Sequence, residues 1–351
     1  MARALEIGDR FIGDDEPCFV IAEIGHNHGG NLDTCKQMFR AAAECGADAV
    51  KLQKRDNRTL FTRQMYESVY NSENAYAPTY GEHREKLEFG LHEYRELQEL
   101  ARELGILFFA TAFDAPSADF LEALDMPCYK IASGDLTNTP LLRHVAGFGK
   151  PMLISTGGAH MEDVQRAYDV VAPINPHICI MQCTAAYPPR HEELNLRVIE
   201  TYRRAFPDTV IGFSSHDNGI AMPLIAYMLG ARIIEKHFTL DRTWKGTDQA
   251  FSLERPGLRR MVRDLARARA ALGDGLKRPF ESERPPLHKM AKKLVAAADL
   301  PRGHILRPGD IAIRSPNDGT PPWRFDDFVG KPLSAPVTAD ENLSEENVRL
   351  G

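Results

Sequence analysis

The sequence predicts a closed (β/α)8 barrel of the TIM-barrel class, followed by a small β-rich domain. Two observations lead to the barrel. Eight strand-like runs alternate with helical runs over about 260 of the 351 residues, which is the number of units and the length of a complete barrel. The strand-like runs are almost continuously apolar, as parallel strands covered on both faces must be. A doubly wound open sheet is the alternative, but the GxGxxG motif that usually follows its first strand is missing.

Each predicted strand is a short β-rich run bounded by glycine, proline or polar residues. The predicted strands are residues 18–25, 48–55, 106–113, 128–135, 151–158, 177–185, 209–216 and 232–239. The segments between them carry apolar residues at helical spacing, and in the first of them Leu32, Cys35 and Met38 share one face before Gly46 ends the helix. The predicted helices are residues 31–47, 92–104, 116–125, 139–148, 160–173, 195–206, 219–229 and 254–273.

Two segments interrupt this alternation and define the domain organisation. Residues 56–90 are polar, carry several aromatic side chains and show no clear periodicity, which is typical of a functional loop or a disordered flap. Residues 274–288 are charged and rich in proline, which indicates a linker. We therefore expect the barrel over residues 1–273, a linker over 274–288 and the β-rich domain over 289–351, which is small for an independent core.

Composition and charge argue against several classes of function. The chain is 43% hydrophobic and 26% charged, with a net charge of -6, so it lacks the basic character expected of a nucleic-acid-binding protein. The N-terminal residues lack the apolar run of a signal peptide, and no segment has the length and hydrophobicity of a membrane span. The six cysteines show no CxxC spacing, which favours reduced, mostly buried thiols. These features predict a soluble, cytoplasmic enzyme.

Two histidines follow the last two predicted strands and are the strongest candidates for the chemical centre. His216 ends the strand 209–216 and His237 lies in the strand 232–239. Because parallel strands joined by a helix bring their C-terminal ends together, the two imidazoles are expected at one rim of the barrel. There they could share one divalent metal, with oxygen ligands and water completing its shell. The alternative is that each histidine only caps its strand and bonds to backbone.

Polar side chains gather at the other strand ends, where barrel enzymes build their sites. Serine hydroxyls, lysine ammonium groups and glycine-flanked amides are what a phosphate group requires. Lys51 and Lys130 alternate with apolar neighbours and should point into the barrel, so each needs a carboxylate partner or an anionic ligand. Lys51 could pair with Glu23 or Glu235, and Glu23 could instead be a general base. The remaining candidates at the rim are Gln53, Ser133, Asp135, Ser155, Tyr187, Ser214 and Asp248.

The motifs that carry these residues resemble those of a known enzyme family. IAEIGHNHGG, GADAVKLQ, YKIASGD, KPMLISTGG, QCTAAYP, GFSSH, EKHFTLD and GTDQAFSLE occur in this order along the chain. They are similar to the sialic acid synthase (N-acetylneuraminate synthase) family, and the resemblance covers nearly the whole chain. The later segments LVAAADLPRGHIL and FVGKPL resemble the antifreeze-like SAF domain that ends this family's members.

The resemblance implies a condensation of phosphoenolpyruvate (PEP) with N-acetylmannosamine, a related hexose or its 6-phosphate, with release of phosphate. It implies Mn²⁺ or Mg²⁺ as the cofactor and a domain-swapped homodimer in which an arginine of one SAF domain reaches the partner's sugar. By the same resemblance, the catalytic residues are Glu23, Asp135, His216 and His237, with the two histidines as metal ligands. The PEP-binding residues are Lys51, Lys130, Ser133, Ser155 and Ser214. The sugar-binding residues are Gln53, Tyr187, Asp248 and Arg314.

Some positions depart from the family's pattern and leave alternatives open. Many bacterial members carry Glu where Asp135 stands, and Ala185 stands where Asn or Ser is common. The segment DRTWKGTDQAFSLE looks like the animal-type synthases, which accept a 6-phosphorylated sugar. The alternative functions are a related PEP:aldose condensing enzyme that uses another aldehyde, and a non-catalytic sugar- or phosphate-binding homologue.

Overall fold

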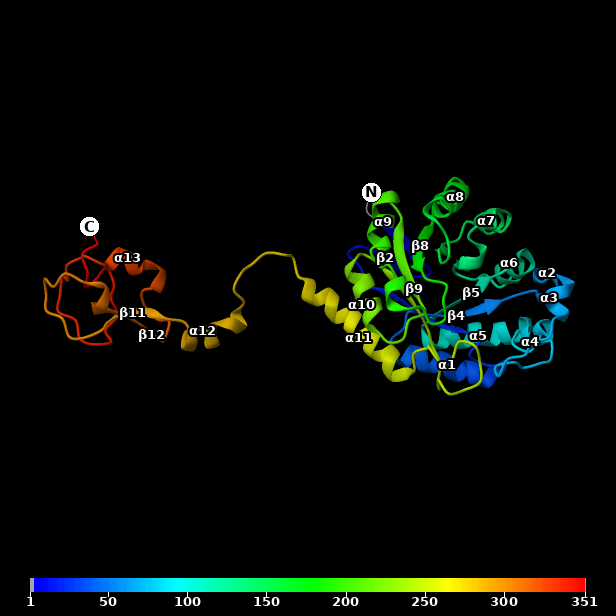
Figure 1. Cartoon of the computed structure of the whole chain (residues 1–351), viewed down its shortest axis with the longest axis horizontal. Coiled ribbons are helices and arrows are strands. Elements are labelled where there is room, and N and C mark those ends of the chain that lie inside the picture. The colour runs from blue at the N-terminus through cyan, green and yellow to red at the C-terminus, as the bar shows by residue number, and fades with distance from the viewer. Residues whose placement is uncertain (1–2, 351) are drawn as a thin grey trace. The chain divides into compact units, whose positions relative to one another are not determined.

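A closed barrel of eight parallel strands forms the first part of the protein (Figure 1). The structure is a computed structural model and describes residues 3–350. The barrel strands are β3 (Phe19–Gly25), β4 (Ala49–Lys54), β5 (Leu107–Ala112), β6 (Tyr129–Ile131), β7 (Met152–Ser155), β8 (Ile178–Cys183), β9 (Val210–Ser215) and β10 (Ile233–His237). The last strand pairs in parallel with the first, from Ile233 beside Phe19 to His237 beside Glu23. This closure confirms the predicted barrel and rules out the open sheet.

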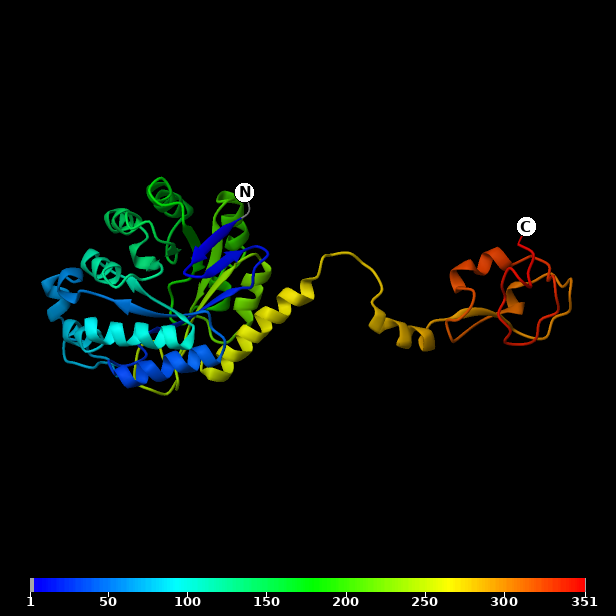
Figure 2. The same cartoon turned by 180° about the vertical axis from the view of Figure 1, so that it is seen from behind.

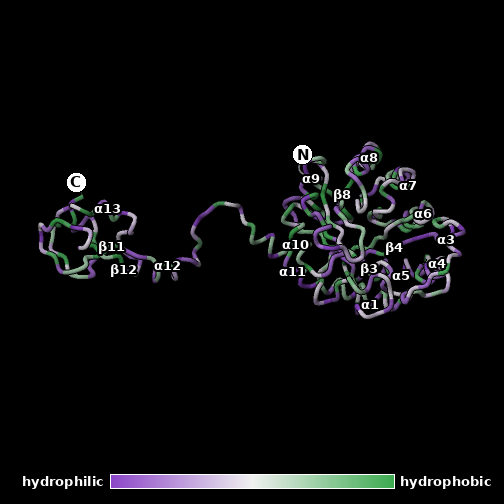
Figure 3. The backbone as a smooth tube through the Cα atoms, viewed as in Figure 1, coloured by the Kyte–Doolittle hydropathy of each residue, from purple (hydrophilic) through white to green (hydrophobic). Residues whose placement is uncertain are grey.

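Helices surround the barrel and follow the predicted order. They are α1 (Leu32–Glu44), α5 (Leu91–Leu104), α6 (Ala115–Glu122), α7 (Thr139–Ala146), α8 (Met161–Val171), α9 (Val198–Ala205), α10 (Ala221–Met228) and α11 (Arg255–Leu272). From behind, α1 and α5 run side by side (Figure 2). Hydrophobic and hydrophilic residues alternate along the outer helices (Figure 3), because one face of each helix packs on the strands and the other meets water. None of the helices in residues 3–350 has the length and apolar character that crossing a bilayer requires.

Two local features differ from the sequence-based expectation. A hairpin of β1 (Ala4–Ile7) and β2 (Arg10–Gly13) precedes the barrel and was not predicted. Its turn lies against Leu107, the first residue of β5, so the hairpin is at the N-terminal end of the strands. Strand β6 has only three residues, because residues 133–135 turn into a short 3-10 helix.

The segment 56–90 is folded and is not a structureless flap. It contains three short helices, α2 (Asn57–Leu60), α3 (Arg63–Glu67) and α4 (Tyr80–Glu85). A cluster of rings around the buried His83 holds the segment together, with Tyr70 at 4.6 Å and Tyr76 at 5.8 Å between ring centres. Aromatic stacking of this kind supplies the apolar contacts that the sequence pattern did not reveal.

A second compact unit begins at Asp274. It contains α12 (Arg284–Met290), the antiparallel pair β11 (Lys293–Ala296) and β12 (Ile311–Arg314), and α13 (Phe325–Phe328). The helix α12 overlaps the end of the segment 274–288, for which we expect a linker. Its two prolines stand in the first turn, where a missing N–H costs nothing. The unit has its own core, made of Leu294, Ala296, Leu306, Ile311, Phe328, Leu333, Val337, Leu343 and Val348.

Candidate active site

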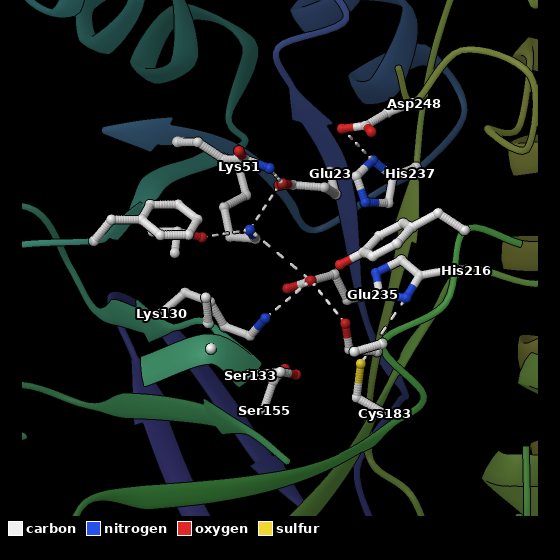
Figure 4. A pocket seen from close by; sticks show the side chains of 18 of the residues that line it. Glu23, Lys51, Lys130, Ser133, Ser155, Cys183, His216, Glu235, His237 and Asp248 are labelled. Carbon is white, nitrogen blue, oxygen red and sulfur yellow. Dashed lines mark hydrogen bonds and ion pairs between the residues drawn. The ribbon is translucent and has the colours of Figure 1, made fainter. Parts of the chain in front are cut away.

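A cavity of about 400 Å³ opens at the C-terminal ends of the barrel strands (Figure 4). It collects most of the residues that the sequence singled out. These are Glu23, Lys51, Gln53, Lys130, Ser133, Ser155, Tyr187, Ser214, His216, His237 and Asp248. The cavity is therefore where the predicted catalytic, PEP-binding and sugar-binding residues meet.

Two buried ion pairs occupy the floor of the cavity. Lys51 Nζ lies 2.7 Å from Glu23 Oε2, and Lys130 Nζ lies 3.1 Å from Glu235 Oε1. The strand register explains the first of these contacts, because Glu23 is paired with Lys51 across β3 and β4. Lys51 also donates to Thr111 Oγ1 at 2.7 Å. Both lysines thus have carboxylate partners, and the two pairs together carry no net charge.

The two carboxylates differ in their tendency to ionise. Burial opposes the charge on Glu235, but the ammonium groups of Lys130 and Lys51 outweigh it and hold the pKa of Glu235 at about 2. Burial is also the largest influence on Glu23, and there it prevails over Lys51 and raises the pKa of Glu23. Two carboxylates whose pKa values are driven apart are suited to different roles, one as a fixed charge and one as a proton carrier.

Several hydroxyls face the lysines. Ser214 Oγ donates to Glu235 Oε1 at 3.0 Å, and Ser133 Oγ accepts from the N–H of Gly157 at 2.9 Å. The buried Ser155 Oγ has no hydrogen-bond partner among the described residues. A buried hydroxyl without a partner is costly unless a ligand supplies one. The serines and lysines thus form a donor-rich surface for an anion.

The two predicted metal ligands lie together, with ring centres 5.4 Å apart. His216 Nδ1 lies 3.0 Å from the carbonyl of Thr184, which fixes a tautomer whose Nε2 lone pair is free. His237 Nδ1 is buried without a hydrogen bond and lies 3.8 Å from Asp248 Oδ2. Burial lowers the pKa of His216 to about 3 and that of His237 to about 4, so both are neutral, the form that binds metals.

The two histidines suit a metal ion whose other coordination positions are filled by substrate and water. Within residues 3–350, no group of three or more His, Cys, Asp or Glu side chains is arranged to hold a metal. The protein would therefore supply His216 and His237, and oxygen atoms of water and substrate would complete the shell. The unpartnered His237 nitrogen and the free lone pair of His216 are consistent with this set.

Two predicted residues are outside the cavity lining. Asp135 lies on the 3-10 helix after β6, half-buried, and accepts from Asn138 Nδ2 at 3.1 Å. Arg314 ends β12 in the second unit, where its guanidinium lies 2.6 Å from Asp340. Their roles at the sugar stay predictions.

Other residues of the lining were not predicted. They are Arg55, Arg84, Thr111, Phe113, Ala132, Gly134, Cys183 and Thr247. Ala185, which departs from the family's pattern, and Glu235, considered as a partner of Lys51, line the cavity as well. Thr111 was predictable, because it is a polar residue near the C-terminal end of a barrel strand. Arg84 comes from α4, and no periodicity in the segment 56–90 pointed to it.

One side of the cavity rim is made of two segments that are far apart in the sequence. The Tyr76 hydroxyl donates to the carbonyl of Lys245 at 2.7 Å, and the Lys245 ammonium lies 5.1 Å from the Tyr76 ring centre. The N–H of Gly246 donates to the side-chain oxygen of Asn74 at 3.0 Å. The segment after β4 and the loop after β10 are therefore fastened to each other, and both supply residues to the lining.

The fold and the cavity define a barrel enzyme that binds an anionic substrate beside a histidine pair. The NeuB family model matches residues 38–277, and the SAF domain model matches residues 293–349. The chain belongs to the NeuB family, and the predicted resemblance is confirmed. It is accordingly a PEP-dependent condensing enzyme of the class that makes nonulosonates.

Characterised relatives match this chain over most of its length. The human N-acetylneuraminate-9-phosphate synthase is 42% identical over 340 residues, which are 97% of this chain and 95% of that protein. The N,N'-diacetyllegionaminic acid synthase of Legionella pneumophila is 34% identical over 342 residues, 96% of each chain. The crystal structure of N-acetylneuraminic acid synthetase from Leptospira borgpetersenii, in complex with citrate, has a TM-score of 0.72 and 33% identity, covering 82% of this chain and 95% of that one.

Proposed function

We propose that the enzyme joins PEP to N-acetylmannosamine or a closely related N-acylated hexose, free or 6-phosphorylated, and makes a sialic-acid-type nonulosonate. The observation that carries the proposal is the single cavity in which a lysine- and serine-lined surface lies beside two neutral histidines. The similarity to the human N-acetylneuraminate-9-phosphate synthase and to the Legionella N,N'-diacetyllegionaminic acid synthase supports this class of product.

The reaction forms one carbon–carbon bond and one carbon–oxygen bond from water, and it breaks the carbon–oxygen bond to phosphate. The methylene carbon of PEP attacks the aldehyde carbon of the open-chain sugar, and water adds to the former enol carbon. The tetrahedral carbon then collapses to the keto group, and phosphate leaves with its bridging oxygen. The water loses two protons, one when it adds and one when the keto group forms. One is balanced by the proton that the aldehyde oxygen gains and the other by the proton that the leaving phosphate takes, so the site needs a group that moves protons.

The residues of the cavity match these requirements. Lys130, Ser155 and Ser133 would hold the phosphate and carboxylate of PEP, with Lys51 and Ser214 beside them. Because PEP is then already held in position, less entropy is lost on reaching the transition state, and the activation free energy of the condensation is lower.

Glu23 is the best candidate for the proton carrier. Its raised pKa brings it closer to neutral pH, and the register places it beside His237. Gln53, Tyr187 and Asp248 line the same cavity and would contact the sugar. Asp135 and Arg314 are not part of the cavity lining, and we propose that they also act on the sugar.

A divalent metal, Mn²⁺ or Mg²⁺, completes the proposal, with His216 and His237 as its protein ligands. When bound, the metal would polarise the aldehyde oxygen. The protein's part is to keep both imidazoles neutral and oriented, through burial and through the bond from His216 to the Thr184 carbonyl.

We also propose a domain-swapped homodimer in the cytoplasm. The second unit has a small core and leaves Trp323 80% exposed, which suits a surface that docks on another molecule. All six cysteines, each within the described residues, are free thiols, as expected in a reducing compartment. Sedimentation analysis of the purified protein tests the dimer.

The function is tested by incubating the protein with Mn²⁺ and PEP, with and without N-acetylmannosamine, its 6-phosphate or other aldoses. We expect phosphate release and a 2-keto-3-deoxy sugar acid only when a sugar is present, with both abolished by EDTA. His216→Ala should lower the rate at least about 100-fold, whereas His92→Ala, an exposed position on α5, should not. The proposal would be contradicted if His216→Ala kept full activity, or if the protein were active only with aldoses that lack an N-acyl group.

A further inference from the structure

Another buried ion pair lies outside the cavity, next to both histidines in the sequence. Lys236 Nζ lies 3.0 Å from Asp217 Oδ1, and each side chain is 1% exposed. Lys236 precedes His237 on β10, and Asp217 follows His216 after the end of β9. Neither member of the pair is part of the cavity lining. The proposed reaction therefore gives this pair no direct contact with substrate.

The direction of the Lys236 side chain follows from the alternation along β10. Glu235 and His237 line the cavity and point into it (Figure 4). Successive side chains of a strand point to opposite faces, so Lys236 points to the outer side of the barrel. On that side it meets the segment that carries His216, because the strand register places Lys236 beside Ser215.

The Lys236 ammonium holds the residues on both sides of His216. It donates to the backbone carbonyl of Asp217, to Asp217 Oδ1 at 3.0 Å and to Ser215 Oγ at 3.5 Å. Ser215 Oγ also donates to Asp217 Oδ1. The ladder between β9 and β10 ends at Ser215 and Lys236, so His216 lies beyond the last paired residues. The Lys236 side chain thus continues the connection between the two segments past the end of the ladder.

Stability alone does not account for this ion pair. Two buried charges lose their hydration, and apolar side chains of similar volume often stabilise a fold equally well or better. Asp217 Oδ2 is also buried without a hydrogen-bond partner among residues 3–350, which adds to the cost. Apolar side chains cannot supply a donor directed at one backbone carbonyl. The donor to the Asp217 carbonyl is therefore the feature that distinguishes the pair from apolar packing.

The two imidazoles are otherwise fixed by contacts on different strands. His216 Nδ1 lies 3.0 Å from the carbonyl of Thr184, which follows β8, and His237 is paired with Glu23 of β3 in the ladder. A metal ion bound by both rings requires their nitrogen atoms at a separation that is correct to a few tenths of an ångström. Lys236 joins the backbone beside His216 to the residue before His237, so it acts directly on this separation.

We propose that Lys236 and Asp217 are positioning residues that set the separation of His216 and His237 and thereby the affinity for the divalent metal. The inference rests on the proposed function, because it takes the two histidines as the metal ligands. Without the bond to the Asp217 carbonyl, the segment carrying His216 can shift relative to β10, and metal binding must then restore the geometry. Loss of groups that orient metal ligands typically lowers metal affinity or activity about 10- to 100-fold.

The affinity for Mn²⁺, measured from the EPR signal of the free ion, tests the proposal without turnover. We expect Lys236→Met to weaken Mn²⁺ binding about 10- to 100-fold. Because this variant leaves Asp217 charged and unpaired, Tm should also fall by about 6 °C or more. The control is Lys150→Met, which removes an ion pair with Asp125 at 2.7 Å, before β7 and away from the histidines. It should leave the Mn²⁺ affinity unchanged.

The double variant Lys236→Met/Asp217→Asn separates positioning from stability, because it removes both charges with little change in volume. Tm should recover most of the loss, whereas Mn²⁺ binding should stay weak, since methionine cannot donate to the backbone carbonyl of residue 217. This variant also decides the question if Lys236→Met does not fold.

Product formation from PEP and a sugar, measured separately, distinguishes this inference from the proposed function. If Mn²⁺ binding is weak in the double variant but the unchanged protein makes no product, the positioning role stands and the condensation fails. If the unchanged protein makes product and the double variant binds Mn²⁺ equally tightly, the condensation stands and the positioning role is wrong, because the pair then only stabilises the fold. Absence of Mn²⁺ binding by the unchanged protein would also overturn the positioning role, whatever the product assay shows.

Discussion

Glu235→Gln is the sharpest perturbation of the charged cavity floor, because it changes one charge and almost no volume. The Glu235 side chain is 5% exposed, and its Oε1 lies 3.1 Å from Lys130 Nζ and 3.9 Å from Lys51 Nζ. The variant leaves two buried ammonium groups with the single carboxylate of Glu23. Removing one partner of a buried pair typically costs about 3–5 kcal/mol, because the other charge stays buried and uncompensated.

For a barrel of this size, about 1 kcal/mol corresponds to roughly 2–4 °C in the unfolding midpoint. We therefore expect Tm of the barrel transition to fall by about 6–20 °C. Differential scanning calorimetry at one scan rate measures it, with the ligand-free proteins in a buffer without phosphate. Added inorganic phosphate should raise Tm more in Glu235→Gln than in the unchanged protein, because an anion can replace the lost carboxylate.

The double variant Glu235→Gln/Lys130→Met is the control, because it removes the ammonium together with its partner. We expect it to recover at least about 2 kcal/mol of the loss. The reasoning would be refuted if Tm of the single variant fell by less than about 2 °C, or if the double variant were no more stable than the single one.

Three further predictions concern packing and protonation. Gly157→Ala would place a Cβ 2.8 Å from Ser133 Oγ and 2.9 Å from the Ala185 backbone nitrogen. We expect it to lower the free energy of unfolding by about 1–3 kcal/mol and to raise KM for PEP. The control is Gly134→Ala, whose Cβ would have no atom within 4 Å and which should leave Tm unchanged. Phe39→Ala removes a fully buried ring 5.0 Å from the Phe108 ring and should cost about 3–5 kcal/mol in thermal unfolding, far more than replacement of an exposed phenylalanine. Stability should also fall as the pH drops from about 6.5 towards 4, since histidines held neutral by burial regain a proton on unfolding and the unfolded state then binds more protons; Tm at pH 7.5 and pH 5 measures this, and an unchanged Tm would contradict it. The histidines with lowered pKa are His26, His28, His83, His216 and His237.

The barrel was predictable because its strands are buried on both faces and carry the apolar runs that this burial requires. All seven residues of β3 and all six of β8 are buried, so periodicity and length identified them. The short β6 and the helix α12 were less predictable. Local polar residues turn the chain after Ile131, and a Pro-Pro pair starts a helix as readily as it breaks one.

The candidate site was predictable as far as it follows from strand register. Residues at the ends of neighbouring parallel strands meet, so His216 and His237 could be placed together from the sequence. The choice of partners could not be predicted: Lys130 contacts Glu235, 105 residues away, across the barrel interior. Arg84 was missed for a different reason, because aromatic packing around His83 positions α4, and such packing leaves no periodic signal.

The fastening of the two rim segments has a consequence for motion. Asn74 and Tyr76 are bound to Gly246 and Lys245, so neither segment can open alone without leaving a donor unpaired. Amide hydrogens of residues 74–83 and 245–247 should then exchange with deuterium as one cooperative unit, with a common opening free energy. Since this unit borders the cavity, its opening rate would set an upper limit on how fast sugar enters and product departs.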